Sequence, residues 1–116
     1  MIDITLPIRT INPTNNRQHW RVVWQRSKGQ RAVVFHAVHG EYPTMPAIVT
    51  MTRISAGTLD DDNLRPALKS IRDGIADAFG VPDNDPRIEW RYAQAKGKRG
   101  EHAVRITIES NGGTDK

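Results

Sequence analysis

Carboxylates gather in two short segments of this 116-residue chain. The first is Leu59-Asp60-Asp61-Asp62-Asn63-Leu64, in which three consecutive carboxylates repel one another. If the segment leaves a strand in extended form, Asp60 and Asp62 project to one side and Asp61 to the other. Two convergent carboxylates supply the oxygen ligands that Mg²⁺ prefers, with water and a substrate phosphate completing its octahedron. The segment therefore predicts a metal site, although a cap and the helix macrodipole also explain acids at a helix start.

The second acidic segment is Pro82-Asp83-Asn84-Asp85-Pro86, and it is also dense in turn-forming residues. It follows a helix expected over residues 64–79, which would be roughly 23 Å long. The residues from Gly80 to Asp85 can retrace only about 17 Å. Asp85 can therefore join Asp60 and Asp62 only if the chain doubles back at once along the helix, or if a second subunit supplies it.

Basic residues outnumber acidic ones, 17 to 13, which gives a net charge of +4 and a pI near 9.9. A polyanionic partner is consistent with this excess, because each neutralised phosphate releases counterions. Three groups of cations lie near one another in the expected elements, and each group alone is typical of a solvated surface. Together, beside an acidic site, they predict a track for a phosphate backbone. The groups are Arg17, Arg21 and Lys28 in a first helix, Arg65, Lys69 and Arg72 in a second, and Lys96, Lys98 and Arg99 in a loop.

The apolar periodicity predicts the elements that position these residues. Period-two alternation indicates strands, and 3.6-residue spacing indicates helices. A stripe of Leu64, Leu68, Ile71 and Ile75 should pack the second helix on the sheet, with Asp62 or Asn63 as its cap and Pro66 in its first turn. Gly80 should end that helix, and Gly29 leaves open whether the first helix is one or two. We expect strands over 2–8, 47–54, 88–95 and 103–109, helices over 17–38 and 64–79, and a hairpin through 96–101.

These elements predict one α+β domain over residues 1–110, in the order β-α-β-α-β-β, with a mixed sheet of about four strands and two main helices. Residues 111–116 should be a disordered tail. There are no cysteines, no membrane-spanning run and no visible secretory signal, so a cytoplasmic protein without membrane partners is expected. The four histidines have no metal-ligand spacing joined to a Glu, and no motif indicates a small-molecule cofactor.

The acidic segments carry a resemblance to a known family. D-x-D-N-L opening an amphipathic helix, then Gly and a D-x-D pair before a strand, resembles the RusA family of phage-type Holliday-junction resolvases. The strand ending ITLP (4–7) and the pair Asn15-Asn16 followed by Arg17 also fit, so the resemblance runs from about residue 3 to 109. Residue by residue, the family's three metal-binding aspartates fall on Asp60, Asp62 and Asp85. The family's functional lysine falls on Pro66, and Lys69 or Arg65 would have to substitute for it.

The resemblance implies a homodimeric endodeoxyribonuclease that depends on Mg²⁺, with Mn²⁺ as an alternative, and serves DNA recombination and repair in a bacterial host or prophage. It would nick the two like strands of a four-way junction symmetrically. Asp60, Asp62, Asp85 and Lys69 would form the catalytic set. The bound metal would activate water, and a neighbouring cation would stabilise the departing 3′ oxygen.

Three other interpretations stay open from the sequence. The acids could serve only as caps and turns in a non-catalytic basic DNA-binding module of the same fold. The chain could be a metal-dependent nuclease acting on flaps or other branched DNA. It could also be a structural phage or host-factor protein with no role in nucleic-acid binding.

Overall fold

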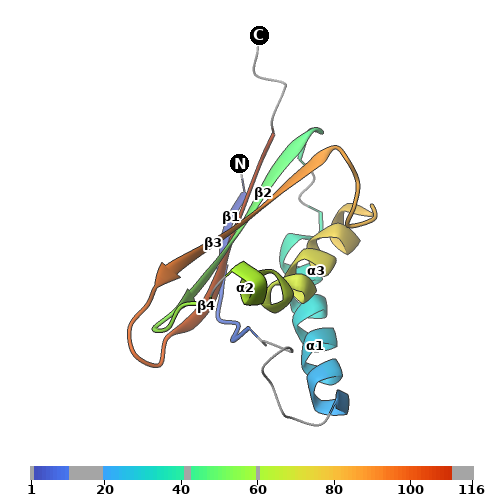
Figure 1. Cartoon of the computed structure of the whole chain (residues 1–116). Helices are drawn as coiled ribbons and strands as arrows, with labels where there is room; N and C mark the ends of the chain where they lie inside the picture. Colours follow the sequence, from blue (N-terminus) through green and yellow to red (C-terminus); the bar gives the residue numbers. More distant parts are fainter. Residues whose placement is uncertain (1, 11–19, 41–42, 60, 111–116) are drawn as a thin grey trace.

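Four strands form one mixed sheet, and the helices cover one of its faces (Figure 1). The computed structural model describes residues 2–10, 20–40, 43–59 and 61–110, with the backbone alone for 20–27 and 61–62. The expected tail at 111–116 lies outside the described residues. The elements are β1 (Ile2–Leu6), α1 (Trp20–Val38), β2 (Ala47–Ser55), α2 (Asp61–Ala67), α3 (Lys69–Phe79), β3 (Ile88–Lys96) and β4 (His102–Ser110).

The strand order is β1-β4-β2-β3. The strand β2 pairs antiparallel with β4 and parallel with β3, and β1 pairs antiparallel with β4 at the far edge. Parallel neighbours need a crossover connection, and α2 and α3 provide it between β2 and β3. The predicted mixed α+β sheet of four strands is confirmed, in the predicted β-α-β-α-β-β order.

The predicted hairpin through 96–101 is wrong. Its two strands, β3 and β4, are not neighbours, because β2 lies between them. The connecting loop crosses the end of β2, where the Gly97 amide donates to the Ser55 carbonyl at 2.8 Å. Crossing one strand requires the loop to span two strand spacings, about 10 Å. Five residues reach about 17 Å, so this loop length suits a hairpin and a crossing equally well.

The predicted helix over 64–79 is two helices, α2 and α3, which meet at an angle at Leu68 (Figure 1). The helical backbone begins at Asp61, so the expected caps Asp62 and Asn63 lie inside it and Pro66 is its sixth residue. Proline has no amide hydrogen for the helix ladder, and its ring crowds the preceding turn. The helix α2 ends at Ala67, and the Leu68 amide donates to the carbonyls of both Leu64 and Arg65 at 3.2 Å before α3 begins. Gly80, with φ +70°, ends α3 as predicted, and its amide donates to the Asp77 carbonyl.

The first helix is a single element, since α1 passes through Gly29 without interruption. Its expected start at Arg17 lies outside the described residues. The apolar stripe is confirmed, because the predicted core positions of α2 and α3 are all at most 4% exposed. They pack on side chains from β2 and β4 that share one sheet face. The core includes Leu64, Leu68, Ile71, Ile75, Val34, Val49, Met51, Val104, Ile106 and Ile108.

No helix among the described residues combines the length and the apolar character needed to cross a bilayer.

The helices α1 and α3 approach closely at Gly74. A Cβ atom at this position would lie 2.6 Å from the Arg31 carbonyl oxygen and 2.9 Å from Val34 Cβ. We therefore expect Gly74→Ala to lower the free energy of unfolding by about 1–3 kcal/mol, the range for overpacked cores. Urea unfolding followed by circular dichroism measures this loss.

Gly29→Ala is the matched control for Gly74→Ala. Gly29 also lies within a helix, but an added Cβ meets no atom within 4 Å. This change should raise the free energy of unfolding by about 0.5–1 kcal/mol, through helix propensity and a less flexible unfolded chain. Equal effects of the two changes would contradict a tight contact between α1 and α3 at Gly74.

Candidate functional site

A side-chain clamp fixes the chain immediately before the first acidic segment. The Leu59 amide donates to Gln94 Oε1 at 2.8 Å, and Gln94 Nε2 donates back to the Leu59 carbonyl at 2.5 Å. Gln94 belongs to β3, so Leu59 is held against the carboxyl-terminal half of that strand. The two reciprocal bonds satisfy both backbone groups of Leu59 and set where the acidic segment begins.

The extended conformation expected for this segment is wrong from Asp61 onward, because α2 already begins there. Successive residues of a helix are turned by about 100°, so strand-like alternation does not explain why Asp60 and Asp62 would converge. Asp60 itself lies outside the described residues, as do the side chains of Asp61 and Asp62. Any convergence of their carboxylates stays a prediction.

Arg53 places a partly buried cation beside the clamp. Its Nη1 donates to the Gly57 carbonyl at 3.0 Å and reaches Gln94 Oε1 at 3.5 Å, and its Nε donates to Thr10 Oγ1 at 3.1 Å. Burial lowers the pKa of the Arg53 guanidinium, which nevertheless stays charged. The sequence analysis missed this residue. The available signal was the strand period of two. Arg53 is on the same face of β2 as the buried residues Val49 and Met51, where a charged residue is unusual.

Asp85 lies at the opposite end of the sheet from the first acidic segment. It precedes Ile88, which pairs with Ala47 at the start of β2, whereas Leu59 is clamped to Gln94. Six residues of strand separate Ile88 from Gln94, or about 20 Å. The structure therefore does not bring Asp85 together with the 60–62 segment inside one chain.

The Asp85 carboxylate closes the turn that leads into β3. Its Oδ1 accepts the Arg87 amide at 2.9 Å and Arg87 Nε at 3.0 Å, and its Oδ2 accepts Arg87 Nη2 at 2.7 Å. The side chain is 8% exposed. The guanidinium and the amide of Arg87 lower the pKa of Asp85 to about 2. These contacts agree with the interpretation of this acid as a turn residue.

These residues have the donor atoms that Mg²⁺ prefers, but the contacts of Asp85 do not favour metal binding. Aspartate oxygens are the correct donors for Mg²⁺. However, three of the lone-pair positions of Asp85 already accept hydrogen bonds from Arg87. Within the described part of the chain, no three His, Asp or Glu side chains cluster as metal ligands would. Asp85 therefore lies away from the described backbone of Asp61 and Asp62 within one chain, whereas Asp60 and the Asp62 carboxylate are outside the described residues.

The predicted row of cations on the second helix is divided among different contacts. Arg72 points inward: its Nη1 donates to Tyr92 Oη at 2.8 Å and its Nη2 to the Asp83 carbonyl at 2.6 Å. Lys69 pairs with Asp73 at 3.2 Å. Arg65 is exposed, and its guanidinium lies over the ring of Tyr92, 5.2 Å from the centroid. Only Arg65 of the three forms no ion pair among the described residues.

The basic loop lies at the same end of the sheet as the acidic segment. Lys96 pairs in register with Ser55, the last residue of β2, and the loop then crosses that strand end. The turn is closed by Glu101, whose Oε1 accepts the Lys98 amide at 2.8 Å. The side chains of Lys96, Lys98 and Arg99 are exposed. This predicted group therefore presents its charge to solvent near the carboxyl end of β2.

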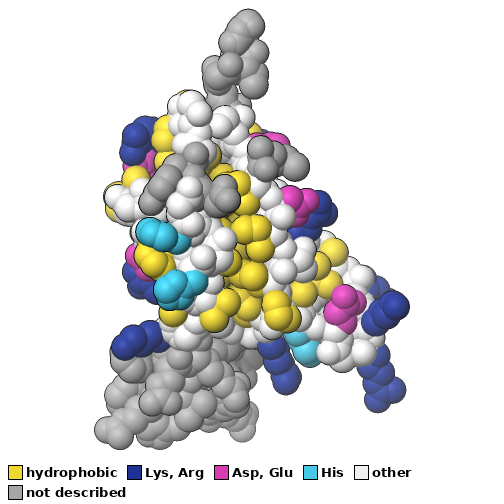
Figure 2. Space-filling view, turned by 180° about the vertical axis from the view of Figure 1, so that it is seen from behind, with side chains coloured by type: hydrophobic (Ala, Val, Ile, Leu, Met, Phe, Trp, Pro, Cys, Tyr) yellow, Lys and Arg dark blue, Asp and Glu magenta, His cyan; other side chains and the backbone are white. Residues whose placement is uncertain are grey.

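The cations predicted on the first helix gain less support. Arg17 and the side chain of Arg21 lie outside the described residues, and Lys28 is exposed on α1. Figure 2 shows the molecule from behind, with Lys and Arg side chains at the margins of a central hydrophobic band. This face presents no continuous row of cations among the residues that the structure describes.

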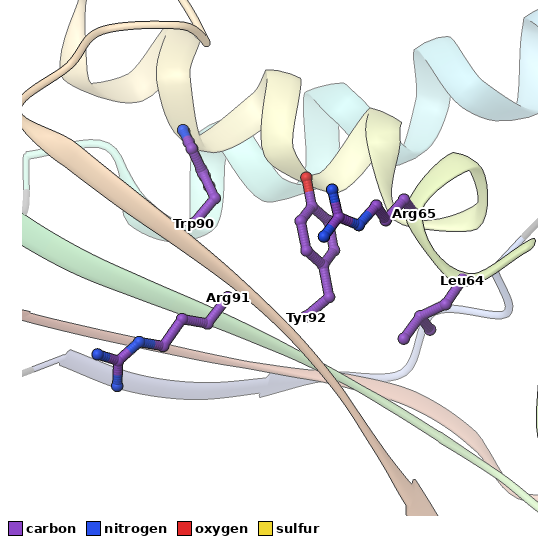
Figure 3. Close-up of a pocket in the computed structure, with 5 residues that line it drawn as sticks. All are labelled: Leu64, Arg65, Trp90, Arg91 and Tyr92. Atoms are coloured by element: carbon purple, nitrogen blue, oxygen red, sulfur yellow. The ribbon is translucent and has the colours of Figure 1, made fainter. Parts of the chain in front are cut away.

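A cavity of about 430 Å³ opens between α2 and β3. Figure 3 shows Arg65 beside the ring of Tyr92, Trp90 directed toward α3, and Arg91 on the other side of the strand. Leu64 completes the lining. Trp90 and Tyr92 are two positions apart in the strand predicted over 88–95, so period-two alternation puts them on one strand face but indicates no functional role for them. The apolar periodicity of the sequence does not predict that α2 packs with a cavity beside these two side chains.

Comparison of the sequence with models of known protein families gives no match, and comparison with functionally curated proteins gives none either.

The Asp85–Arg87 contact makes stability depend on pH. The pKa of Asp85 is about 2 in the folded chain and near its ordinary value of about 3.9 in the unfolded chain. The contact therefore stabilises fully above about pH 5, and this contribution is lost as the pH falls toward 2. We expect Asp85→Asn to lower the free energy of unfolding at neutral pH, to lose about half of that effect near about pH 3 and to lose most of it near about pH 2.

Urea unfolding across this pH range tests the linkage, with Arg87→Ala as the partner variant. Arg87→Ala should also have a lower free energy of unfolding than the native chain at neutral pH, and this difference should shrink as the pH falls, because the variant removes the other half of the contact. A constant difference at all pH values would mean that Arg87 does not favour the ionised carboxylate.

Proposed function

We propose that this protein is a Mg²⁺-dependent endodeoxyribonuclease that hydrolyses phosphodiester bonds in Holliday junctions or related branched DNA. One observation carries the proposal: the acidic segment follows a clamped residue, Leu59, at the end of β2 where the basic loop and Arg53 also lie. Carboxylate oxygens for a metal and cations for phosphate are the two requirements of such chemistry. The resemblance of D-x-D-N-L to the RusA family supports the same activity.

Asp60, Asp62 and Asp85 would hold the metal in this proposal, with Mn²⁺ as an alternative to Mg²⁺. The bound ion would supply an activated water and neutralise charge on the scissile phosphate. Arg53 is held by Gly57, Gln94 and Thr10, so it contributes a fixed positive charge that needs no rearrangement to act on an anion.

Arg65 is the stronger candidate to replace the lysine that the family has at the position of Pro66. Lys69, the other candidate, is paired with Asp73, and binding a phosphate would require breaking that pair. Arg65 forms no ion pair among the described residues and lies nearer to the acidic segment along α2. Lys96, Lys98 and Arg99 would contact the DNA backbone from the loop.

A homodimer resolves the separation of the aspartates. The 60–62 segment and Asp85 flank opposite ends of β3 in one chain. A two-fold axis between the subunits can place the two copies of β3 in opposite directions. The partner's Asp85 can then approach the 60–62 segment of the first chain. Two such composite sites would face the two like strands of a four-way junction.

The runner-up is a non-catalytic DNA-binding module of the same fold. The Asp85 contacts favour it, because Arg87 occupies that carboxylate as a structural turn requires. In that case the acidic segment would only cap α2, and the cations would bind DNA without cleavage.

Cleavage by carboxylate variants separates these two functions. Asp62→Asn should reduce cleavage of a four-way junction in Mg²⁺ by at least about 100-fold, since losing even an outer-shell partner of a metal costs 10–100-fold. Binding measured by gel shift should be unchanged or tighter, because the lost charge repels phosphate. Asp3→Asn is the matched control. It removes the same charge from the uncovered face of the sheet, where Asp3 pairs with Arg105, and should cleave normally. Wild-type cleavage by Asp62→Asn would refute the nuclease assignment.

Mixing subunits tests the composite site directly. Asp62→Asn and Asp85→Asn homodimers should each be inactive, but a heterodimer would contain one site with both changes and one intact site. Random mixing makes half of the dimers heterodimers, so about one quarter of wild-type nicking should return. Nicking of one strand of a labelled junction measures this. If all three ligands came from one chain, every site in the mixture would carry a change and no activity would return.

A further inference from the structure

The cavity between α2 and β3 has the lining of an anion-binding site. Leu64, Arg65, Trp90, Arg91 and Tyr92 line it; the Arg91 side chain turns to the other side of β3, so Arg65 supplies the cation that faces the cavity, and none of the five is a carboxylate (Figure 3). Its volume of about 430 Å³ lies within the range of about 300–1,000 Å³ that is common for small-ligand sites. Arg65 is the candidate phosphate-binding residue of the proposed nuclease, and the cavity beside it has no role in that activity so far.

The aromatic wall of the cavity is contacted from behind by Arg72. Trp90 and Tyr92 occupy one face of β3, two positions apart, and each is only partly buried although it packs against the core. The Arg72 guanidinium lies 4.7 Å from the Trp90 ring centroid and donates to Tyr92 Oη at 2.8 Å. Arg72 in turn is anchored by the Asp83 carbonyl. Arg72 therefore contacts both aromatic side chains from behind the cavity.

Arg65 supplies the free charge at the front of this wall. Its guanidinium carbon is 5.2 Å from the Tyr92 ring centroid, and the side chain is exposed. Among the described residues, none forms a salt bridge with Arg65, whereas Arg91 pairs with Glu89 and Arg72 with Asp83. A planar guanidinium matches the geometry of a phosphate in two-point contact.

We propose that this cavity holds one nucleotide of an unpaired DNA strand, a role that rests on the proposed function. The Arg65 guanidinium would swing from the Tyr92 ring to the adjoining phosphate, and the base would stack against the wall of Tyr92 and Trp90 that it leaves open. Stacking on aromatic side chains accepts any base, because every base has a flat π face. Leu64 and Arg65 follow the acidic segment directly in α2, so a nucleotide seated here would hold the strand next to the proposed cleavage site.

Binding without metal tests the cavity separately from cleavage. The probe is a 5′-fluorescein-labelled oligodeoxythymidylate of about ten nucleotides, titrated by fluorescence anisotropy in EDTA at fixed salt. Arg65→Ala and Tyr92→Leu should each weaken binding by about ten-fold or more. Tyr92→Phe keeps the ring, and Arg105→Ala removes an equal charge from the other face of the sheet. Arg105→Ala should stay within about two-fold of the native chain, since it removes none of the proposed contacts. Tyr92→Phe keeps the stacking ring and loses only the bond from Arg72, so it should bind more tightly than Tyr92→Leu.

Equal weakening by Arg65→Ala and Arg105→Ala would overturn the proposal, because general charge attraction would then explain binding. Native-like binding by Tyr92→Leu would overturn it too, as would dTMP binding as tightly as the oligonucleotide. Thermal unfolding checks each variant, and if Tyr92→Leu does not fold, the comparison of Arg65→Ala with Arg105→Ala decides.

Cleavage of a four-way junction in Mg²⁺ distinguishes failure of the nuclease proposal from failure of the cavity proposal. Selective loss of strand binding by the cavity variants, with no cleavage by the native chain, would support the cavity and refute the nuclease. Native cleavage that Arg65→Ala and Tyr92→Leu leave unchanged, together with unchanged strand binding, would refute the cavity alone.

Discussion

The parallel pairing of β2 with β3 is the constraint on which the arrangement of the charged residues depends. Because both strands run in one direction, the segment after β2 and the segment before β3 must lie at opposite ends of the sheet. The helices α2 and α3 have to travel the length of the sheet between them. This separates Asp85 from the 60–62 segment, and it brings the loop after β3 back to the first acidic segment. Had β3 been antiparallel to β2, both acidic segments would have met at one end.

Much of the fold could be predicted from the sequence, because strands and helices have distinct apolar periods. The four strands and the buried stripe of Leu64, Leu68, Ile71 and Ile75 followed from this rule. The neighbours of each strand did not follow, since a five-residue loop can make a hairpin or cross β2 with equal ease. The break at Leu68 lies two residues after Pro66, whose ring and missing amide hydrogen disturb the turn before it. The sequence places Pro66 in the first turn of the helix. The helix begins at Asp61, three residues earlier than the apolar pattern indicates, so Pro66 lies beyond the first turn.

The candidate site was less predictable, because its contacts join residues far apart in the chain. Helical spacing predicts Arg65, Lys69 and Arg72 near one another on one helix, but Arg65 belongs to α2 and the other two to α3, and spacing gives no information about what each side chain contacts. Arg72 turns inward because Tyr92 and the Asp83 carbonyl offer acceptors there. The Gln94 clamp on Leu59 likewise depends on the register between β2 and β3. Periodicity therefore locates charges on a surface, whereas tertiary partners decide which charges remain for a ligand.

A cavity for a single nucleotide, beside a site that cuts DNA, would also account for a preference for branched substrates. Bases in a continuous duplex are paired and stacked, so filling the cavity would require extruding a nucleotide at a cost of a few kcal/mol. That cost falls where a base is already unpaired, as at a junction or flap. In this proposal the cations at the carboxyl end of β2 would attract the phosphate backbone of DNA of any sequence, because backbone contacts carry no sequence information directly. Discrimination would then come from the wall of Trp90 and Tyr92, which Arg72 contacts from behind and on which an unpaired base could stack.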